Sequence, residues 1–234
     1  MTREPGALRV AVVDYGAGNL VSIEQALTFV GADVHVATGP ADLEATDAVI
    51  VPGVGAAAPA MDRLTRAGLV DPLLRWIALG RPYLGICLGL QLLFDGSDED
   101  GAATFGVIPG RTVLLEDAPT LPHIGWNQVE RRHEHALFAG IADGADLYFV
   151  HSYAGRPEGA GADATTLAET QHGGGRFVSA VDRGNVLGVQ FHPERSGGAG
   201  LRLLANFTRW ATALALGAGA ERSPVGAGGT AGSD

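Results

Sequence analysis

The sequence of 234 residues contains no lysine and a single cysteine, Cys87. One cysteine excludes an intramolecular disulfide and cannot by itself build a thiolate metal site, so any role it has is that of a free thiol. All 16 basic residues are arginine, against 26 acidic residues, which gives a net charge of -10. Such a charge repels the phosphates that dominate nucleic-acid affinity, so DNA or RNA binding is not expected.

Long hydrophobic runs are also missing, because no stretch approaches ~18 apolar residues without a polar interruption. The first residues lead directly into a strand pattern with no small-residue cleavage site, so we expect a cytoplasmic protein without membrane contact. Aromatic residues make up only 6% and charged residues 18%, while the 46% of hydrophobic residues are mainly aliphatic. This composition is typical of a globular domain with one core.

Short apolar runs alternate with helical patterns in the first half of the chain. Residues 8–14 and 82–86 are predicted to be strands buried on both faces, and residues 19–30 an amphipathic helix. Strand candidates of the second half are expected to include antiparallel additions to the same sheet. We therefore predict an α/β fold with an open, mostly parallel mixed sheet flanked by helices.

The end of the chain and one internal segment have biased composition. A helix over residues 200–216 is predicted to close a domain that spans residues 1–216. Gly, Ala, Ser and Pro make up 13 of the 18 residues from 217 to 234, so this tail is predicted to be disordered. Residues 154–164, rich in glycine, are predicted to form a mobile surface loop.

Cys87 stands where a strand is predicted to turn sharply into a helix. Gly85 and Gly89 flank it, which is the pattern of a nucleophile elbow. Such a turn holds the nucleophile in a strained conformation that only small neighbours tolerate, and the helix N-terminus stabilises a thiolate. A buried cysteine that acts as a small hydrophobe is the alternative, and the flanking glycines disfavour it.

Another strand end, at residues 15–19, holds Gly-x-Gly before a helix, as dinucleotide-binding loops do. The third glycine of that fingerprint is replaced by Val21, and residues 34–36 supply no acidic partner for a ribose. We therefore expect neither a nicotinamide nor a flavin cofactor, and the sequence indicates no metal site.

A cysteine nucleophile needs a base, and the sequence offers seven histidines. His192 follows an apolar strand, and Glu194 stands two residues further on. This spacing puts the imidazole and the carboxylate on one side of an extended segment, so Glu194 can orient the ring as the acid of a triad does. His123 and His151 lie in distinctive segments and remain alternatives for the base.

Six segments in order carry a resemblance to a known family. GICLGLQ at 85–91 and GVQFHPE at 188–194 resemble the class I, triad-type glutamine amidotransferases. Within that class the sequence is similar to the glutaminase subunits of imidazole glycerol phosphate synthases, from histidine biosynthesis. The segments that carry this are DYGAGNL at 14–20, PGVG at 52–55, PHIGWN at 122–127 and YFVHSY at 148–153.

The resemblance spans residues 8–212, with small departures at Leu90, where Met is common, and Arg195, where Lys is usual. Two other readings stay open at this point. Glutaminase subunits for anthranilate or aminodeoxychorismate synthesis generally lack the Trp126 segment and the opening at 14–20. A non-catalytic α/β binding module would be expected to lack a member of the triad, and all three are present.

The resemblance implies that Cys87 attacks the side-chain amide of L-glutamine, that His192 moves the proton and that Glu194 holds the imidazole. Leu88, directly after the nucleophile, is expected from the geometry of the elbow to offer a backbone N–H to the oxyanion. The family likeness assigns the other donor to a loop and the α-groups of glutamine to four residues: Gly53, Val54 and Gly55 for the loop, and Gln91, Glu99, Ser152 and Tyr153 for glutamine.

The family likeness also implies a partner, a cyclase subunit with a (βα)8 barrel that takes up the ammonia in a heterodimer. A chain of 234 residues cannot hold a second domain of ~250 residues, so the cyclase is expected to be a separate chain. We expect the loop at 52–55 to be misaligned until the cyclase binds, which would leave the isolated subunit nearly silent. The docking face is predicted at the rim of the elbow, at Asn19, Trp126, Tyr148 and Arg195.

Overall fold

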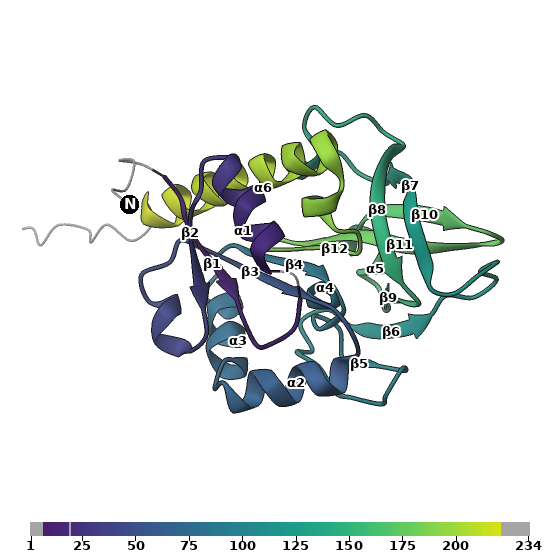
Figure 1. Cartoon of the computed structure of the whole chain (residues 1–234), viewed down its shortest axis with the longest axis horizontal. Coiled ribbons are helices and arrows are strands. Elements are labelled where there is room, and N and C mark those ends of the chain that lie inside the picture. Colours follow the sequence, from purple (N-terminus) through teal and green to yellow (C-terminus); the bar gives the residue numbers. More distant parts are fainter. Residues whose placement is uncertain (1–6, 19, 221–234) are drawn as a thin grey trace, which may run out of the picture.

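A nine-stranded mixed sheet forms the centre of the computed structural model, which describes residues 7–18 and 20–220 (Figure 1). Its strand order is β2-β1-β3-β4-β12-β11-β10-β7-β8. The first five of these strands are parallel to one another: β2 (Asp33–Ala37), β1 (Arg9–Val13), β3 (Ala48–Gly53), β4 (Tyr83–Cys87) and β12 (Val186–Val189).

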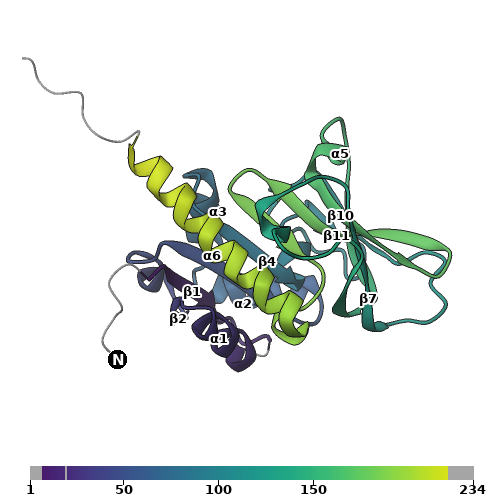
Figure 2. The ribbon, with the colours of Figure 1, turned by 90° about the horizontal axis from the view of Figure 1, so that it is seen from above.

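The other four strands extend the sheet in antiparallel fashion: β11 (Gly175–Arg183), β10 (Thr166–His172), β7 (His123–Arg131) and β8 (Ala145–His151). A small second sheet lies against this region and contains β5 (Gly96–Ser97), β6 (Gly110–Leu114) and β9 (Tyr153–Pro157). Figure 2 shows the antiparallel strands standing to one side of the helix-covered part. The predicted α/β class with an open mixed sheet is confirmed.

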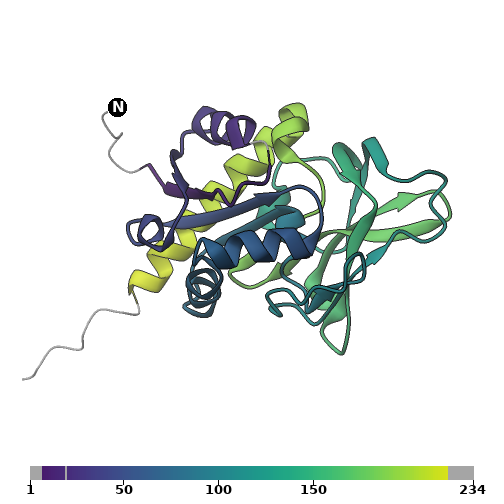
Figure 3. The same cartoon turned by 60° about the horizontal axis from the view of Figure 1, so that its bottom comes forward.

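Helices cover both faces of the parallel strands. On one face lie α1 (Leu20–Phe29) and α6 (Gly197–Ala220), and on the other α2 (Ala57–Arg66) and α3 (Val70–Ala78), which come forward in Figure 3. Two helices are short, α4 (Leu88–Gln91) and α5 (Ala162–Thr165). Three 3-10 turns complete the order: η1 (Pro40–Leu43), η2 (Ala136–Phe138) and η3 (Pro193–Arg195).

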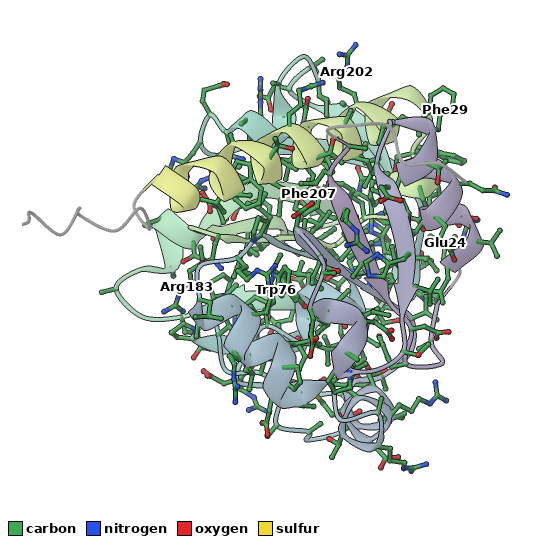
Figure 4. The ribbon with its side chains drawn as sticks, turned by 90° about the vertical axis from the view of Figure 1, so that its left-hand side faces the viewer. Glu24, Phe29, Trp76, Arg183, Arg202 and Phe207 are labelled. Atoms are coloured by element: carbon green, nitrogen blue, oxygen red, sulfur yellow. The ribbon has the colours of Figure 1, made fainter. Side chains whose placement is uncertain are left out.

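The alternation of side chains along each parallel strand explains the two-sided core. In β1, Val10 and Val12 join the cluster that contains Phe207 of α6, whereas Ala11 and Val13 join the cluster that contains Trp76 of α3. Figure 4 labels Phe207 and Trp76 on the two sides of the sheet. A strand buried on both faces needs apolar residues at every position, which is why these strands are continuous apolar runs.

Two segments differ from the sequence prediction. The prediction of a loop over the whole of 154–164 is wrong, because residues 153–157 form β9 and residues 162–165 form α5, and only residues 158–161 lie in a loop. Gly155 pairs with Thr112 of β6, and this strand position needs a glycine because the Phe94 ring occupies the space of a Cβ. Helix α6 ends at Ala220, four residues beyond the predicted end, while Asn19 and residues 221–234 lie outside the described residues.

The antiparallel region curls back to meet the segment after β12. The backbone N–H of His192 donates to the carbonyl of Tyr148 in β8 at 2.8 Å, and the N–H of Tyr148 donates to Ser196 Oγ at 2.9 Å. These two bonds fix β8 against the carboxyl end of the parallel strands. None of the described helices has the length and apolar character needed to cross a membrane.

Candidate active site

Cys87 ends β4 in a strained backbone conformation, with φ 54° and ψ -108°, and α4 begins at the next residue. A Cβ on Gly89 would overlap the carbonyl oxygen of Val51, and one on Gly85 would overlap the backbone at Gly89. Both glycines are therefore required by close backbone packing. This geometry is that of a nucleophile elbow.

His192 and Glu194 form a buried pair immediately after the last parallel strand. Nδ1 of His192 lies 2.9 Å from Oε1 of Glu194, and both side chains are less than a tenth exposed. Burial alone would lower the pKa of His192, but Cys87 and Glu194 outweigh it and raise that pKa to about 10. Among the described residues, none lies in hydrogen-bonding geometry with the buried Nε2 of His192.

A cavity of about 260 Å³ opens at Cys87 and gathers residues from both regions of the sheet. Seven of its lining residues are among those predicted from the sequence: Val54, Gly55, Cys87, Gln91, Glu99, Ser152 and Tyr153. Of the other three, His151 was an alternative for the base, and Pro122 and Val150 were not given a role. The cavity is large enough for a small amino acid and has the nucleophile in its wall.

A chain of amide hydrogen bonds leads from the cavity wall to the sulfur. Gln91 Nε2 donates to the carbonyl of Tyr153 at 2.8 Å and to Gln190 Oε1 at 3.2 Å, and Gln190 Nε2 donates to Cys87 Sγ at 3.6 Å. Gln190 is fully buried. Sequence reasoning did not single it out, although it precedes His192 by two residues and so faces the same side of the extended segment.

Glu99 lines the cavity, while its acidic neighbours are engaged elsewhere. Asp98 pairs with Arg111, and Asp100 accepts the backbone N–H of Ala58 at 2.6 Å. Partial burial, and then the charge of Asp100, raise the pKa of Glu99 above its usual value. A cationic group in the cavity would relieve both effects, since it would favour the ionised carboxylate.

The loop predicted to hold the oxyanion lies beside the elbow. Gly53 is the last residue of β3 and pairs in register with Cys87, and Gly55 has a φ of 90° that suits glycine. The Tyr15 side chain occupies the space of a Cβ on Gly53, and its buried hydroxyl has no hydrogen-bond partner. Val54 is 49% exposed at the tip of this loop.

Three of the four residues predicted for the docking face contact one another. The rings of Trp126 and Tyr148 meet edge to face with centroids 5.0 Å apart, and the Arg195 guanidinium lies 4.2 Å above the Tyr148 ring. Trp126 and Tyr148 are mid-strand residues paired in the register of β7 and β8, and Arg195 lies in η3 after β12. The fourth residue, Asn19, is outside the described residues.

Comparison with known proteins agrees with this geometry. The family model for glutamine amidotransferase class-I matches residues 11–210, and the chain belongs to this family. It is 44% identical over 206 residues to the imidazole glycerol phosphate synthase subunit HisH of Syntrophotalea carbinolica, covering 85% of this chain and 98% of the relative. The protein of the same name from Symbiobacterium thermophilum is 46% identical over 204 residues, covering 86% and 93% of the two chains.

Solved structures share the fold at low identity. The structure of PurLQS from Thermotoga maritima superposes with a TM-score of 0.68 at 16% identity, over 87% of this chain and 99% of the other. The family resemblance inferred from the sequence is thus confirmed, and the protein is a glutamine amidotransferase enzyme.

Proposed function

We propose that this protein is the glutaminase subunit of an imidazole glycerol phosphate synthase, which releases ammonia from glutamine for a separate cyclase subunit. The observation that carries the proposal is Cys87 in the wall of a cavity, close enough to His192 to raise the pKa of its ring, with Nδ1 of that ring 2.9 Å from Oε1 of Glu194. The names of the relatives at 44% and 46% identity supply the pathway.

The reaction begins when Cys87 Sγ attacks the side-chain amide carbon of glutamine. The oxyanion of the tetrahedral intermediate is stabilised by the backbone N–H of Leu88 and by one from the Val54 loop. His192 holds the proton taken from the thiol and delivers it to the departing ammonia, while Glu194 keeps the ring oriented. Water, deprotonated by His192, then hydrolyses the γ-glutamyl thioester to glutamate.

Substrate binding uses the residues that line the cavity together with the nucleophile. The Glu99 carboxylate pairs with the α-ammonium group of glutamine, which would reverse the upward shift in its pKa that burial causes in the empty cavity. Both Nε2 protons of Gln91 are already donated, so its Oε1 is the atom left to accept from the α-ammonium group, while the backbone of Ser152 and Tyr153 holds the α-carboxylate. The α-groups are therefore fixed at one end of the cavity and the amide at the other, which presents the amide carbon to Sγ.

The cyclase docks on the outer face of the β7–β8 hairpin. Ile124 and Trp126 are 62% and 63% exposed there, and their register partners are Val150 and Tyr148. Exposed aromatic and aliphatic residues rimmed by an arginine are typical of a protein-interaction surface. Because Tyr148 accepts a hydrogen bond from the His192 backbone at 2.8 Å, docking here acts directly beside the active site.

A glutaminase assay with and without the cyclase tests the proposal. We expect slow hydrolysis by the isolated subunit and strong stimulation when the cyclase is bound and its nucleotide site is occupied. Imidazole glycerol phosphate must also form from glutamine only when both chains are present. Rapid hydrolysis that the cyclase leaves unchanged would contradict the assignment.

A further inference from the structure

Two histidines beside the cavity take no part in the chemistry described above. His123 and His151 face each other across β7 and β8 on the inner side of the hairpin, and both are less than a tenth exposed. The His123 ring also stacks on His172, with centroids 4.0 Å apart, and on Phe149 at 5.1 Å. His151 lines the cavity that holds Cys87, so this pair reaches the substrate site.

The hydrogen bonds of His151 define its tautomer. Its Nδ1 lies 2.9 Å from the carbonyl oxygen of Tyr153, and a carbonyl only accepts, so Nδ1 carries the proton. Nε2 of the neutral ring is then an acceptor, and Nδ1 of His123 donates to it over 3.4 Å. The tautomer of His151 is thus set from both sides.

Asn127 sets the tautomer of His123 in the same way. Its Oδ1 accepts the backbone N–H of Gln128 at 2.9 Å and its Nδ2 donates to the carbonyl of Gln171 at 2.8 Å, which fixes the amide orientation. The second proton of Nδ2 is directed at Nε2 of His123, 3.3 Å away. Donation therefore runs in one direction, from Asn127 through both imidazoles to the Tyr153 carbonyl.

Both rings are kept neutral, as this chain of bonds requires. Burial lowers the pKa of His123 to about 4 and that of His151 to about 3, and the charges of His172 on both rings and of His192 on His151 act in the same direction. A protonated His151 would have no acceptor at Nε2 for His123.

The Tyr153 carbonyl at the end of the chain is also the acceptor for Gln91 Nε2, at 2.8 Å. We propose that His151, oriented by His123, is a positioning residue for glutamine, because it fixes the Tyr153 carbonyl and hence the Gln91 side chain in the cavity wall. This inference rests on the proposed function only in that the ligand of the cavity is glutamine. His151 acts through Tyr153 and Gln91 and not on the reacting atoms.

Steady-state kinetics of the complex with the cyclase test the proposal. We expect His151→Leu to raise the KM for glutamine roughly threefold to tenfold, as the loss of one buried hydrogen bond implies, with kcat changed less than about twofold. His151→Asn retains an N–H donor near the position of Nδ1 and should recover most of the affinity. His172→Phe keeps the stacking on His123, lies outside the chain of bonds, and should leave KM unchanged.

Several results would overturn the inference. They are a wild-type KM in His151→Leu, no recovery in His151→Asn, or a fall in kcat with KM unchanged. Nitrogen-15 NMR of the histidine rings in the wild-type protein tests the same point without relying on a variant that folds. A neutral, Nδ1-protonated His151 at pH 7 supports the proposal, and an Nε2-protonated ring contradicts it. Absence of glutaminase activity in the wild-type complex would instead refute the proposed function. The NMR result would then decide whether His151 holds the Tyr153 carbonyl as proposed.

Discussion

The two regions of the nine-stranded sheet contribute to the site in different ways. The parallel strands β3 and β4 are six and five residues long and wholly buried, so they have no free face and present chemistry only at their ends. The antiparallel strand β7 is nine residues long and alternates buried or half-buried residues with exposed ones. A strand covered on both faces can therefore place a nucleophile only at its end, whereas a strand with one exposed face also presents a row of side chains to the solvent.

Strand β12 is where the two regions meet. It is parallel to β4 on one side and antiparallel to β11 on the other, and His192 and Glu194 follow it. Catalysis at the elbow is therefore expected to depend on the parallel region, where Cys87 ends β4 and His192 follows β12, and cyclase binding on the antiparallel region, where Trp126 and Tyr148 lie. Variants in each region should separate these properties.

Removal of the nucleophile should have the largest effect. Cys87→Ala is expected to abolish glutamine hydrolysis, because no other thiol is present in the sequence. The same complex should still form imidazole glycerol phosphate from added ammonium salts, since the thiol generates ammonia but does not use it. Both activities are measured on one preparation with the cyclase, and loss of both in a folded, cyclase-bound variant would contradict this division between the two regions.

Removal of the base, His192, which follows β12, should have the next largest effect. His192→Ala is expected to lower kcat by roughly 10²- to 10⁴-fold, the usual contribution of general acid–base catalysis. Glu194→Gln should lower it less, because Glu194 orients the ring and does not transfer the proton. Stopped-time assays of glutamate release compare the two variants, and near-normal turnover in His192→Ala would direct attention to His123 or His151.

A substitution that disturbs the close packing under the elbow should lower the free energy of unfolding. Gly89→Ala is expected to lower the free energy of unfolding by about 1–3 kcal/mol or more, because the new Cβ would overlap the Val51 carbonyl. Gly198→Ala is the matched control, since a Cβ there meets nothing within 4 Å. Urea denaturation measures both, and equal midpoints would mean that the parallel region tolerates a wider elbow.

The parallel region could be largely predicted from sequence because burial on both faces leaves an unbroken apolar run. The antiparallel region could not be predicted as well. Strand β9 contains Gly155, and a glycine considered alone favours a loop. The position needs a glycine because the ring of Phe94, 61 positions earlier in the chain, occupies the space of a Cβ. A contact between residues so far apart in the chain leaves no local sequence pattern from which it could be predicted.

The candidate site shows the same limit. The spacing of His192 and Glu194 is a local rule, and the two side chains do meet at 2.9 Å. Residues two apart in an extended segment face the same side, so Gln190 could also have been predicted to face the site. The hydrogen bond from its amide to Cys87, however, depends on the neighbouring strand β4. The meeting of Trp126 and Tyr148 depends on the β7–β8 register, which short segments do not reveal.

Variants on the outer face of the hairpin should impair association and leave the elbow intact. Trp126→Ala is expected to weaken cyclase binding roughly tenfold to a hundredfold, as for a central aromatic contact. Arg195→Glu should act in the same direction, because it removes the cation–π contact with Tyr148, at 4.2 Å, and reverses the charge. Leu79→Ala is a control, since Leu79 is 56% exposed beyond α3 on the helix-covered side. Isothermal titration measures the dissociation constants, and unchanged values for both hairpin variants would place the interface elsewhere.

The smallest expected effect is on stability in mild acid, and it should arise in the antiparallel region. The pKa values of His123 and His151 lie near 4 and 3 in the folded protein, below the ordinary 6.5. Protons therefore bind the unfolded chain first, and stability is lost as the pH falls below 6.5. His192 has the opposite shift, with a pKa of about 10, so its contribution is complete below pH 6.5 and is lost only as the pH rises toward 10.

Urea denaturation at pH 7 and pH 5 isolates this contribution, because most carboxylates titrate at lower pH. The wild type should lose at most about 2 kcal/mol for each shielded imidazole over that interval, and His151→Leu should lose correspondingly less. Val129→Ala, a buried change in β7 that keeps both imidazoles, controls for a general loss of stability and should show the wild-type pH dependence. The raised pKa of Glu99 acts in the opposite direction and reduces the wild-type loss equally in all three proteins. An identical pH dependence in wild type and His151→Leu would show that His151 is not held neutral by the fold.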